Sequence, residues 1–238
     1  MFGFGRHRLV KSGILQGKTD IHCHVLPGVD DGSPDADHSL DLLDYMAEDL
    51  GFKEVWFTPH VMADGGNTAA RLQARLDEFL PLYEGDIKIH LASEYMMDQG
   101  FRERLHTDPL RLGKSHLLVE TSYMSGPHDL YKILEDVWNC GFHPLIAHPE
   151  RYMYMDMDDY NELKSNGYEF QLNFMSLSGY YGPVPKEKAE RFLSEGMYDF
   201  TGSDLHHLHR YEDYLYDLKL TRKQLDALER LFENNVNV

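Results

Sequence analysis

The sequence predicts an α/β fold in which parallel strands alternate with helices. Short β-branched or aromatic runs, typical of strands, are followed by stretches of helical length whose apolar residues recur every three or four positions. No internal repeat, Pro-rich linker or low-complexity segment divides the 238 residues. Since parallel strands need crossover connections, this alternation favours a parallel sheet covered by helices. The pattern by itself allows either an open doubly wound sheet or a closed barrel.

Seven segments are expected to form strands. In chain order they cover residues 20–25, 54–58, 87–91, 116–120, 144–147, 169–173 and 198–201. Each has the length that strands in globular proteins usually have. The segments between them are long enough to hold a helix, so each strand can be followed by a crossover.

Helix start and stop signals fall between these strands. Ser33 and Pro34 predict the start of a first helix, which should end at Gly51. Asn67 predicts the N-cap of a second helix, and Pro81 its end. Three further helices are expected over residues 130–137, 185–195 and 221–232.

Charge divides the chain into a basic start and an acidic remainder. The net charge is −17, but residues 1–18 contain Arg6, Arg8, Lys11 and Lys18 and no acidic residue. We therefore expect a flexible basic extension over residues 1–18 and one domain over residues 19–238. The acidic domain disfavours nucleic-acid binding through a broad basic face, because phosphate contacts need many Lys and Arg side chains.

Cysteine content and the lengths of apolar runs indicate where in the cell the protein is located. The two cysteines, Cys23 and Cys140, are too few for a disulfide framework and favour a reducing compartment. No apolar run approaches the roughly 20 residues of a membrane span, and the N-terminus has no apolar signal-peptide core. The sequence therefore predicts a cytoplasmic protein that does not span a membrane.

Residue types that bind metals stand at or just after the ends of the expected strands. Because the C-terminal ends of parallel strands meet on one face, these side chains should converge there. His22 and His24 lie two residues apart on one strand, so both imidazoles point to the same side. The expected ligands are His22, His24, Asp31, His60, Glu94, Glu120, His148, Asp204 and His206.

Nine nitrogen and oxygen ligands are more than one ion needs, and they suit two or three. The mixture of nitrogen and oxygen ligands favours Mn, Fe or Zn over Ca or Mg. Three divalent cations would outweigh the charge of the four carboxylates, so the site would attract a phosphate dianion despite the acidic chain.

The motifs that contain these residues resemble the PHP superfamily of polymerase-associated and histidinol-phosphate phosphatase domains. The resemblance rests on five runs, which are TDIHCHVLPGVDDG at 19–32, TPH at 58–60, LVE at 118–120, AHPER at 147–151 and GSDLH at 202–206. Within that superfamily the chain is similar to the manganese-dependent protein-tyrosine phosphatases of bacterial capsule and exopolysaccharide operons. The resemblance extends over residues 19–210.

The resemblance implies a distorted (β/α)7 TIM-like barrel with a trinuclear metal site at the C-terminal strand ends. All nine expected ligands match positions of the family pattern, with Glu94 as a bridge between two ions. It also implies hydrolysis of phosphotyrosine by a metal-activated hydroxide, with a bacterial tyrosine kinase as the protein substrate. Arg151 matches the arginine that faces the phosphate, and Arg210 is a second, looser candidate for that role.

Tyr152 is the candidate for contact with the phosphotyrosine ring, because it follows Arg151 directly. The general acid stays open among His60, His206 and a water molecule.

Three other functions remain as alternatives. A PHP-type histidinol-phosphate phosphatase, or another small phosphomonoester phosphatase, would use the same metal chemistry. A PHP nuclease is disfavoured by the acidic charge. A catalytically inactive metal-binding scaffold is the alternative from a different class. A cysteine-dependent phosphatase is excluded because neither Cys23 nor Cys140 is followed by Arg six positions later.

Overall fold

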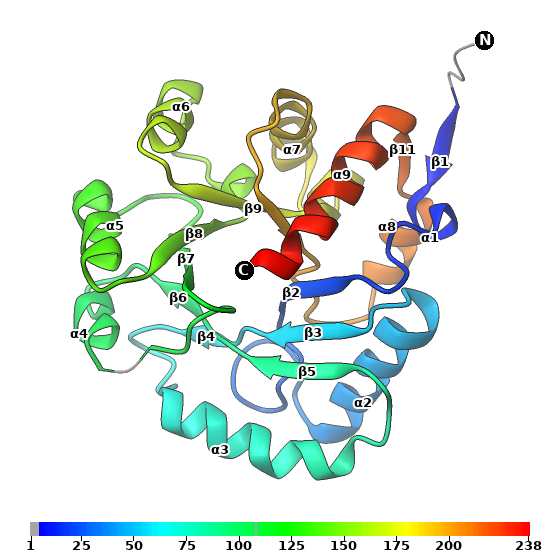
Figure 1. The fold of residues 1–238 in the computed structure, drawn as a ribbon, viewed down its shortest axis with the longest axis horizontal. Helices are drawn as coiled ribbons and strands as arrows, with labels where there is room; N and C mark the ends of the chain where they lie inside the picture. The colour runs from blue at the N-terminus through cyan, green and yellow to red at the C-terminus, as the bar shows by residue number, and fades with distance from the viewer. Residues whose placement is uncertain (1–4, 108) are drawn as a thin grey trace.

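The computed structural model describes residues 5–107 and 109–238 and has an α/β architecture in which helices surround a curled parallel sheet (Figure 1). One sheet has the strand order β10-β9-β8-β7-β6-β4, and a second has the order β2-β3-β5. All pairs within these two sheets are parallel. The strands are β2 (Thr19–Cys23), β3 (Glu54–Phe57), β4 (His60–Val61), β5 (Lys88–Leu91), β6 (Glu94–Met96), β7 (His116–Glu120), β8 (His143–Ala147), β9 (Glu169–Asn173) and β10 (Phe200–Gly202).

Backbone hydrogen bonds connect the two sheets where β2 passes the end of β10. The amide of His24 donates to the carbonyl of Leu205 at 2.9 Å, and the amide of Asp204 donates to the carbonyl of His22 at 2.8 Å. Cys23 and Leu205 form a parallel bridge between them. The start of the domain is thus joined directly to a segment near its end.

All seven expected strands are present, and their ends agree with the sequence interpretation within two residues. The short strands β4 and β6 were not expected. Each continues the preceding strand, β3 or β5, after two intervening residues, so the second and third strands are interrupted. The interruptions move His60 and Glu94 onto strand segments of their own.

The five expected helices are also present. They are α2 (Ala36–Asp44), α3 (Ala69–Phe79), α5 (Leu130–Asn139), α7 (Pro183–Glu195) and α9 (Arg222–Asn234). A π-helical turn over Tyr45–Asp49 extends α2, and a 3₁₀ turn over Leu80–Leu82 follows α3 and contains Pro81, as expected from the sequence.

Two helix starts were predicted wrongly. The N-cap of α2 is Asp35 instead of Ser33, and the N-cap of α3 is Thr68 instead of Asn67. In each case an acceptor oxygen binds a free amide of the first turn, which is what a cap requires. The Asn67 side chain instead donates to the carbonyl oxygens of Val29 and His60, at 2.9 and 2.8 Å.

Several short elements had no clear sequence signal. They are β1 (Arg6–Arg8), α1 (Leu9–Ser12), α4 (Phe101–Leu105), α6 (Met157–Ser165), α8 (Tyr211–Asp217) and β11 (Lys219–Thr221). Apart from α6, each has seven residues or fewer, too few for periodicity to distinguish it from a loop.

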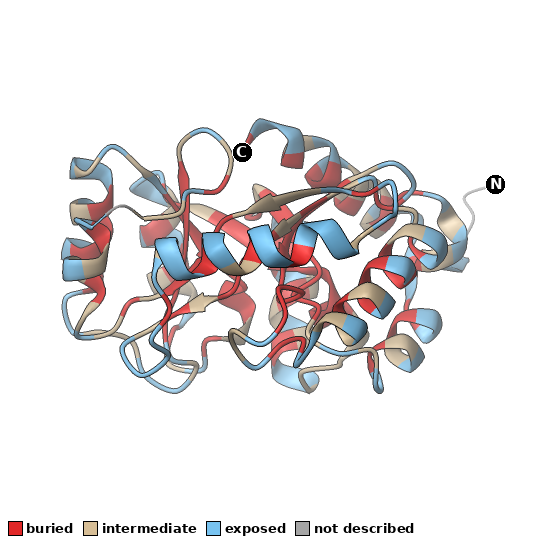
Figure 2. Ribbon diagram, turned by 90° about the horizontal axis from the view of Figure 1, so that it is seen from below, coloured by how far each residue is buried: buried red, intermediate tan, exposed pale blue. Residues whose placement is uncertain are grey.

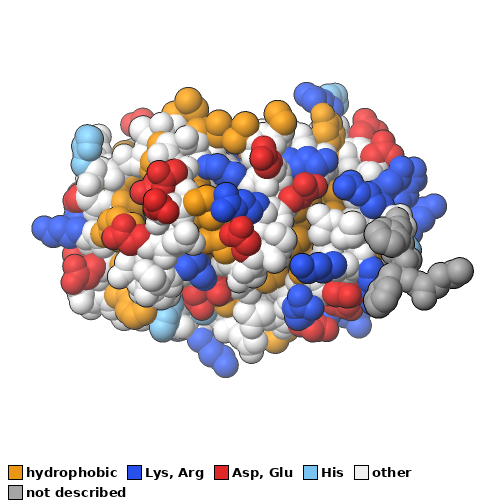
Figure 3. Space-filling model, turned by 90° about the horizontal axis from the view of Figure 1, so that it is seen from above, with side chains coloured by type: hydrophobic (Ala, Val, Ile, Leu, Met, Phe, Trp, Pro, Cys, Tyr) orange, Lys and Arg blue, Asp and Glu red, His pale blue; other side chains and the backbone are white. Residues whose placement is uncertain are grey.

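The expected basic extension is largely packed onto the domain. β1 pairs with β11 in antiparallel orientation, and Leu9, Ile14 and Leu15 are buried in the core. The expectation of a flexible segment is therefore wrong for residues 5–18, because their apolar side chains are buried. Arg6 and Arg8 of β1 are exposed. Figure 3 shows Lys and Arg side chains gathered on several parts of the face it displays.

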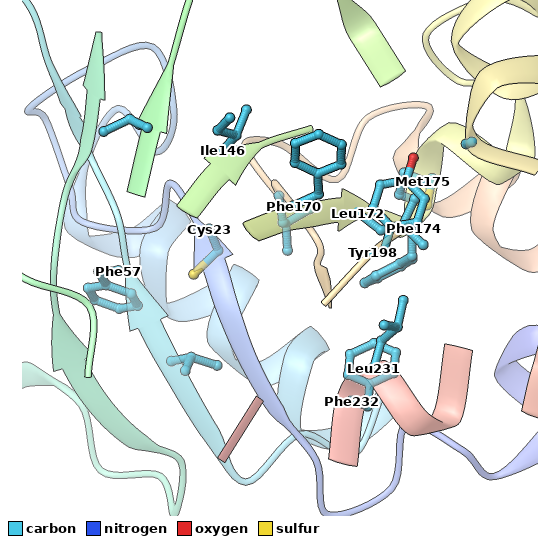
Figure 4. Packing of buried hydrophobic residues seen from close by; sticks show 14 of the residues in the cluster. Cys23, Phe57, Ile146, Phe170, Leu172, Phe174, Met175, Tyr198, Leu231 and Phe232 are labelled. Carbon is cyan, nitrogen blue, oxygen red and sulfur yellow. The ribbon is translucent and has the colours of Figure 1, made fainter. Parts of the chain in front are cut away.

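Helices bury their inner faces against the sheet and expose their outer faces (Figure 2). Figure 4 shows part of this core, where Phe174 lies near Phe232 of α9, with ring centres 5.7 Å apart. Cys23 is fully buried in the same core. As strand alternation predicts, it lies between two histidines that point the other way. No helix in the described residues is both long and apolar enough to cross a bilayer.

Candidate metal centre and active site

The structure brings the side chains of all nine expected ligands into one cluster. Three sets of these residues have ligand atoms close enough to hold an ion, namely His22/His24/Glu94/Asp204, His60/Glu94/Glu120 and His24/Asp31/His60/His206. The ninth residue, His148, places Nε2 at 2.8 Å from Oε1 of Glu94. His24, His60 and Glu94 belong to two sets each, so the sets form one continuous centre.

The first set is fully enclosed. The Nε2 atoms of His22 and His24 lie 3.2 Å apart, and each is 3.4 Å from Oδ1 of Asp204. Oε2 of Glu94 lies 3.3 Å from the first of these nitrogens and 3.4 Å from the second. Four ligands placed tetrahedrally about 2.0–2.1 Å from one ion would be roughly 3.3–3.4 Å from one another. The spacing of these four atoms therefore fits a divalent cation.

The second set lies on the other side of Glu94. His60 Nδ1 is 3.2 Å from Oε2 of Glu94 and 3.0 Å from Oε1 of Glu120. These three atoms are buried, and none has a hydrogen-bond partner among the described residues. Buried polar atoms are normally paired, so three unpaired atoms that face one another fit a cation between them.

The third set is open to solvent. Oδ1 of Asp31 lies 3.5 Å from Nε2 of His60 and 3.4 Å from Nε2 of His206. The Asp31 side chain is 73% exposed, whereas those of His22, His24 and Glu94 are 0% exposed. The centre is thus closed at one end and accessible at the other.

Two residues that the sequence did not single out orient the first two histidines. His22 donates from Nδ1 to Oε1 of Gln171 at 3.0 Å, and His24 donates from Nδ1 to Oδ2 of Asp30 at 2.9 Å. With the proton fixed on Nδ1, each Nε2 presents its lone pair to the centre. Asp30 could have been found from the sequence, because it stands next to the expected ligand Asp31. Gln171 lies within a strand, and no sequence pattern distinguishes it.

The ionisable side chains of the centre shift one another's pKa values. Burial alone would raise the pKa of Glu94, but the nearby imidazoles of His22 and His148 lower it well below its usual range. Burial would lower the pKa of His22, but Glu94 and Asp204 raise it to about 9. The carboxylates thus favour positive charge at this point, and bound divalent cations would provide it.

Arg151 belongs to the turn after β8, Pro149–Arg151, which also presents His148. His148 has a φ angle of 33°, which is strained for a residue other than glycine. The buried Glu150 carboxylate holds this turn by accepting hydrogen bonds from the Asn173 amide, the Ser176 hydroxyl and the Tyr198 hydroxyl. The AHPER run is therefore a structural unit as well as a source of site residues.

A pocket of about 250 Å³ opens beside the exposed end of the centre. Its lining consists of Asp31, His60, Tyr123, Arg151, Tyr180, Tyr181, Asp204, His206 and Tyr211. Arg151 donates from Nη1 to Oδ2 of Asp204 at 2.7 Å. Burial would lower the pKa of Arg151, but Asp204 raises it, so the guanidinium stays charged. The pocket thus combines possible metal ligands, one cation and aromatic walls.

Two of the expected substrate contacts, Tyr152 and Arg210, do not line the pocket. Tyr152 is buried behind the centre, where its hydroxyl donates to the Ala147 carbonyl at 2.9 Å, so its predicted contact with a substrate ring is wrong. Inside the core the ring is packed and its hydroxyl is hydrogen-bonded. The position of Tyr152 next to Arg151 in the sequence does not reveal this burial.

Arg210 is exposed at the start of α8, with its guanidinium 5.9 Å from the centre of the Tyr214 ring. It is not part of the pocket lining, and its contact with the phosphate stays a prediction. The tyrosines that do line the pocket, Tyr123, Tyr180, Tyr181 and Tyr211, come from loops and from the start of α8, and no sequence pattern distinguished them from other tyrosines.

Known proteins are similar to this chain in sequence. Tyrosine-protein phosphatase YwqE of Bacillus subtilis is 27% identical over 203 residues, which cover 79% of this chain and 77% of that protein. Tyrosine-protein phosphatase CpsB of Streptococcus pneumoniae is 25% identical over 236 residues, which cover 91% of this chain and 95% of that protein.

Solved structures support the same fold. A crystal structure from work on YwqE and CpsB, described as metal-dependent tyrosine phosphatases, matches with a TM-score of 0.71 at 24% identity and covers 92% of both chains. A histidinol phosphate phosphatase of Lactococcus lactis, complexed with zinc, L-histidinol and phosphate, matches with a TM-score of 0.50 at 14% identity. It covers 92% of this chain and 94% of that one.

The model of a protein family described as "Capsular polysaccharide synthesis, CpsB/CapC" matches residues 18–236, which is nearly the whole chain. The protein therefore belongs to the CpsB/CapC family of capsular polysaccharide synthesis.

Proposed function

We propose that this protein is a metal-dependent protein-tyrosine phosphatase. The observation that carries the proposal is the convergence of nine metal-ligand residues beside a pocket that contains Arg151. Membership in the CpsB/CapC family and the names of its relatives support the same activity. The complete ligand set counts against an inactive scaffold.

The finer architecture that we propose is a distorted (β/α)7 barrel with the metal site at the C-terminal ends of its strands. The curled order of strands from β2 to β10, and the bonds between His22, His24 and residues 204–205, support this description.

The nine residues would hold two or three divalent ions, and we propose Mn, with Fe or Zn as alternatives. Glu94 would bridge two ions, because its Oε2 atom belongs to two of the three sets. When bound, such ions would activate a water molecule as the nucleophile and neutralise phosphoryl charge.

The chain's own residues would bind and orient the phosphoryl group. Arg151 is fixed at the pocket wall, and a guanidinium matches the geometry of phosphate oxygens. Its charge would stabilise the oxygens as negative charge redistributes during transfer. A tyrosine leaving group, with a pKa near 10, needs less protonation than an alkyl alcohol would.

For the biological context we propose a phosphotyrosine protein as the substrate, namely a bacterial tyrosine kinase that acts in capsule or exopolysaccharide synthesis. We also propose a cytoplasmic location. Both cysteines are free, one of them fully buried, and this fits a reducing compartment.

The test compares substrates and metal content in one preparation. Metal-loaded protein should hydrolyse a phosphotyrosine peptide far faster than the matching phosphoserine peptide or histidinol phosphate, and a chelator should abolish the activity. Faster hydrolysis of histidinol phosphate would favour the small-substrate alternative. Bound metal without any phosphatase activity would favour the scaffold.

A further inference from the structure

The guanidinium of Arg151 lies between two aromatic rings. Its central carbon is 4.2 Å from the centre of the Tyr123 ring and 4.1 Å from the centre of the Tyr181 ring. Tyr123 follows β7, Arg151 follows β8 and Tyr181 follows β9, so three neighbouring loops build this arrangement. Two rings therefore lie against the guanidinium and limit the directions from which a ligand can approach it.

One nitrogen of the guanidinium is already bound. Oδ2 of Asp204 accepts hydrogen bonds from Nη1 of Arg151 at 2.7 Å, from Nδ2 of Asn173 at 2.8 Å and from the Tyr181 hydroxyl at 3.2 Å. Two rings and one carboxylate thus contact the guanidinium at the same time and restrict its movement. The other N–H groups of Arg151 remain for the pocket that it lines.

We infer that Tyr123 and Tyr181 are positioning residues, which clamp Arg151 so that its other N–H groups are aimed at the phosphoryl group before substrate binds. This inference rests on the proposed phosphatase function. A long, flexible arginine normally loses conformational freedom when it binds phosphate, and a guanidinium that is already ordered avoids that loss. The rings also attract the cation, more strongly here than at an exposed site, because the guanidinium is largely desolvated.

The two tyrosines should contribute differently. No hydrogen bond among the described residues holds the Tyr123 hydroxyl, so its ring alone should matter. The Tyr181 hydroxyl donates to Asp204 and accepts a hydrogen bond from Asn173 at 2.9 Å, so both its ring and its hydroxyl should matter. Phenylalanine should therefore replace Tyr123 well and Tyr181 only in part.

The experiment is a double-mutant cycle on metal-loaded protein. Tyr123→Leu should lower kcat/KM for a phosphotyrosine peptide by roughly 5- to 30-fold, as expected for the loss of a desolvated cation–π contact. It should weaken binding of inorganic phosphate, measured by calorimetry, by a similar factor. Tyr123→Phe should restore most of both values. In an Arg151→Ala background, Tyr123→Leu should change either value by less than twofold.

Tyr131→Leu is the control, because Tyr131 is an exposed tyrosine of α5 that does not line the pocket. Metal content and melting temperature are measured for every variant, so that unfolding is recognised. The clamp is refuted if Tyr123→Leu lowers phosphate affinity equally with and without Arg151, or if Tyr123→Phe is as defective as Tyr123→Leu. If the wild-type protein does not hydrolyse phosphotyrosine, the proposed function fails, but the phosphate titrations still decide whether the clamp exists.

Discussion

Arg151 and Asp204 are joined by a hydrogen bond of 2.7 Å that links the pocket to the candidate metal centre. The two oxygens of the Asp204 carboxylate have separate partners. Oδ2 accepts from Arg151, whereas Oδ1 lies 3.4 Å from the Nε2 atoms of both His22 and His24. A residue that would hold a metal ion therefore also fixes the residue that would hold the phosphoryl group.

Replacement of Arg151 should separate catalysis from metal binding. Arg151→Ala should lower kcat/KM on a phosphotyrosine peptide by roughly 10²–10³, as is typical when one preorganised charge-stabilising donor is removed. Arg151→Lys should recover little, because an ammonium group cannot make two parallel contacts. Steady-state kinetics with elemental analysis checks this. Near wild-type turnover in Arg151→Ala would show that Arg151 does not stabilise the phosphoryl group.

Replacement of His148 should behave differently. His148→Ala removes a nitrogen 2.8 Å from Glu94, so we expect metal content and activity to fall together. His143→Ala is a suitable control, because His143 is an exposed residue at the opposite end of the same strand, β8. Full metal content in an inactive His148→Ala protein would contradict a ligand role for His148.

A chelator should remove metal in steps. The set with Asp31 is open to solvent, whereas the set of His22, His24, Glu94 and Asp204 is enclosed. Brief treatment with EDTA should therefore remove about one equivalent quickly and the remainder slowly. Asp31→Asn should lack the fast phase and contain about one ion fewer. Loss of all metal in a single phase, in both proteins, would show that the ligand sets do not differ in their accessibility to EDTA.

The stability of the loop after β6 should depend on pH through Asp98. Partial burial would raise the pKa of Asp98, but hydrogen bonds from Arg104 and the backbone amides of Ala63 and Gly100 lower it. A carboxylate with a lowered pKa stabilises the fold above its unfolded pKa, near 4, and this contribution is lost as the pH falls through the folded value.

Asp98→Asn should therefore cost about 1–2 kcal/mol of unfolding free energy at pH 7, and the difference from wild type should shrink below about pH 4. Asp64→Asn, at an exposed position nearby, is the control and should change little at either pH. Denaturant unfolding at both pH values measures the effect. A difference that stays constant between them would show that the charge of Asp98 does not stabilise the loop.

The sequence predicted well where the strands lie and that the nine expected ligands converge, because both follow from simple rules of strand geometry. Alternation places His22 and His24 on one side of β2, and parallel topology brings the strand ends together. It could not predict which tyrosines line the pocket. Tyr152 and Tyr123 both lie near the ligands, but the course of the loops buries the first and exposes the second to the pocket.

The N-caps of the helices also could not be predicted from residue type alone. Ser33, Asp35, Asn67 and Thr68 are all good caps by residue type. Tertiary contacts decide among them, since Asn67 is engaged by the carbonyls of Val29 and His60, and only Thr68 remains to cap α3.

The bonds between β2 and residues 204–205 have a consequence for biosynthesis. His22 is synthesised long before Asp204, and the two lie together only in the folded chain. Antiparallel pairing of β1 with β11 also needs residues 219–221. Contacts between such distant segments form late in folding. A nascent chain therefore cannot complete the enclosed ligand set until Asp204 has been synthesised, so all four of its residues could bind an ion together only after that point.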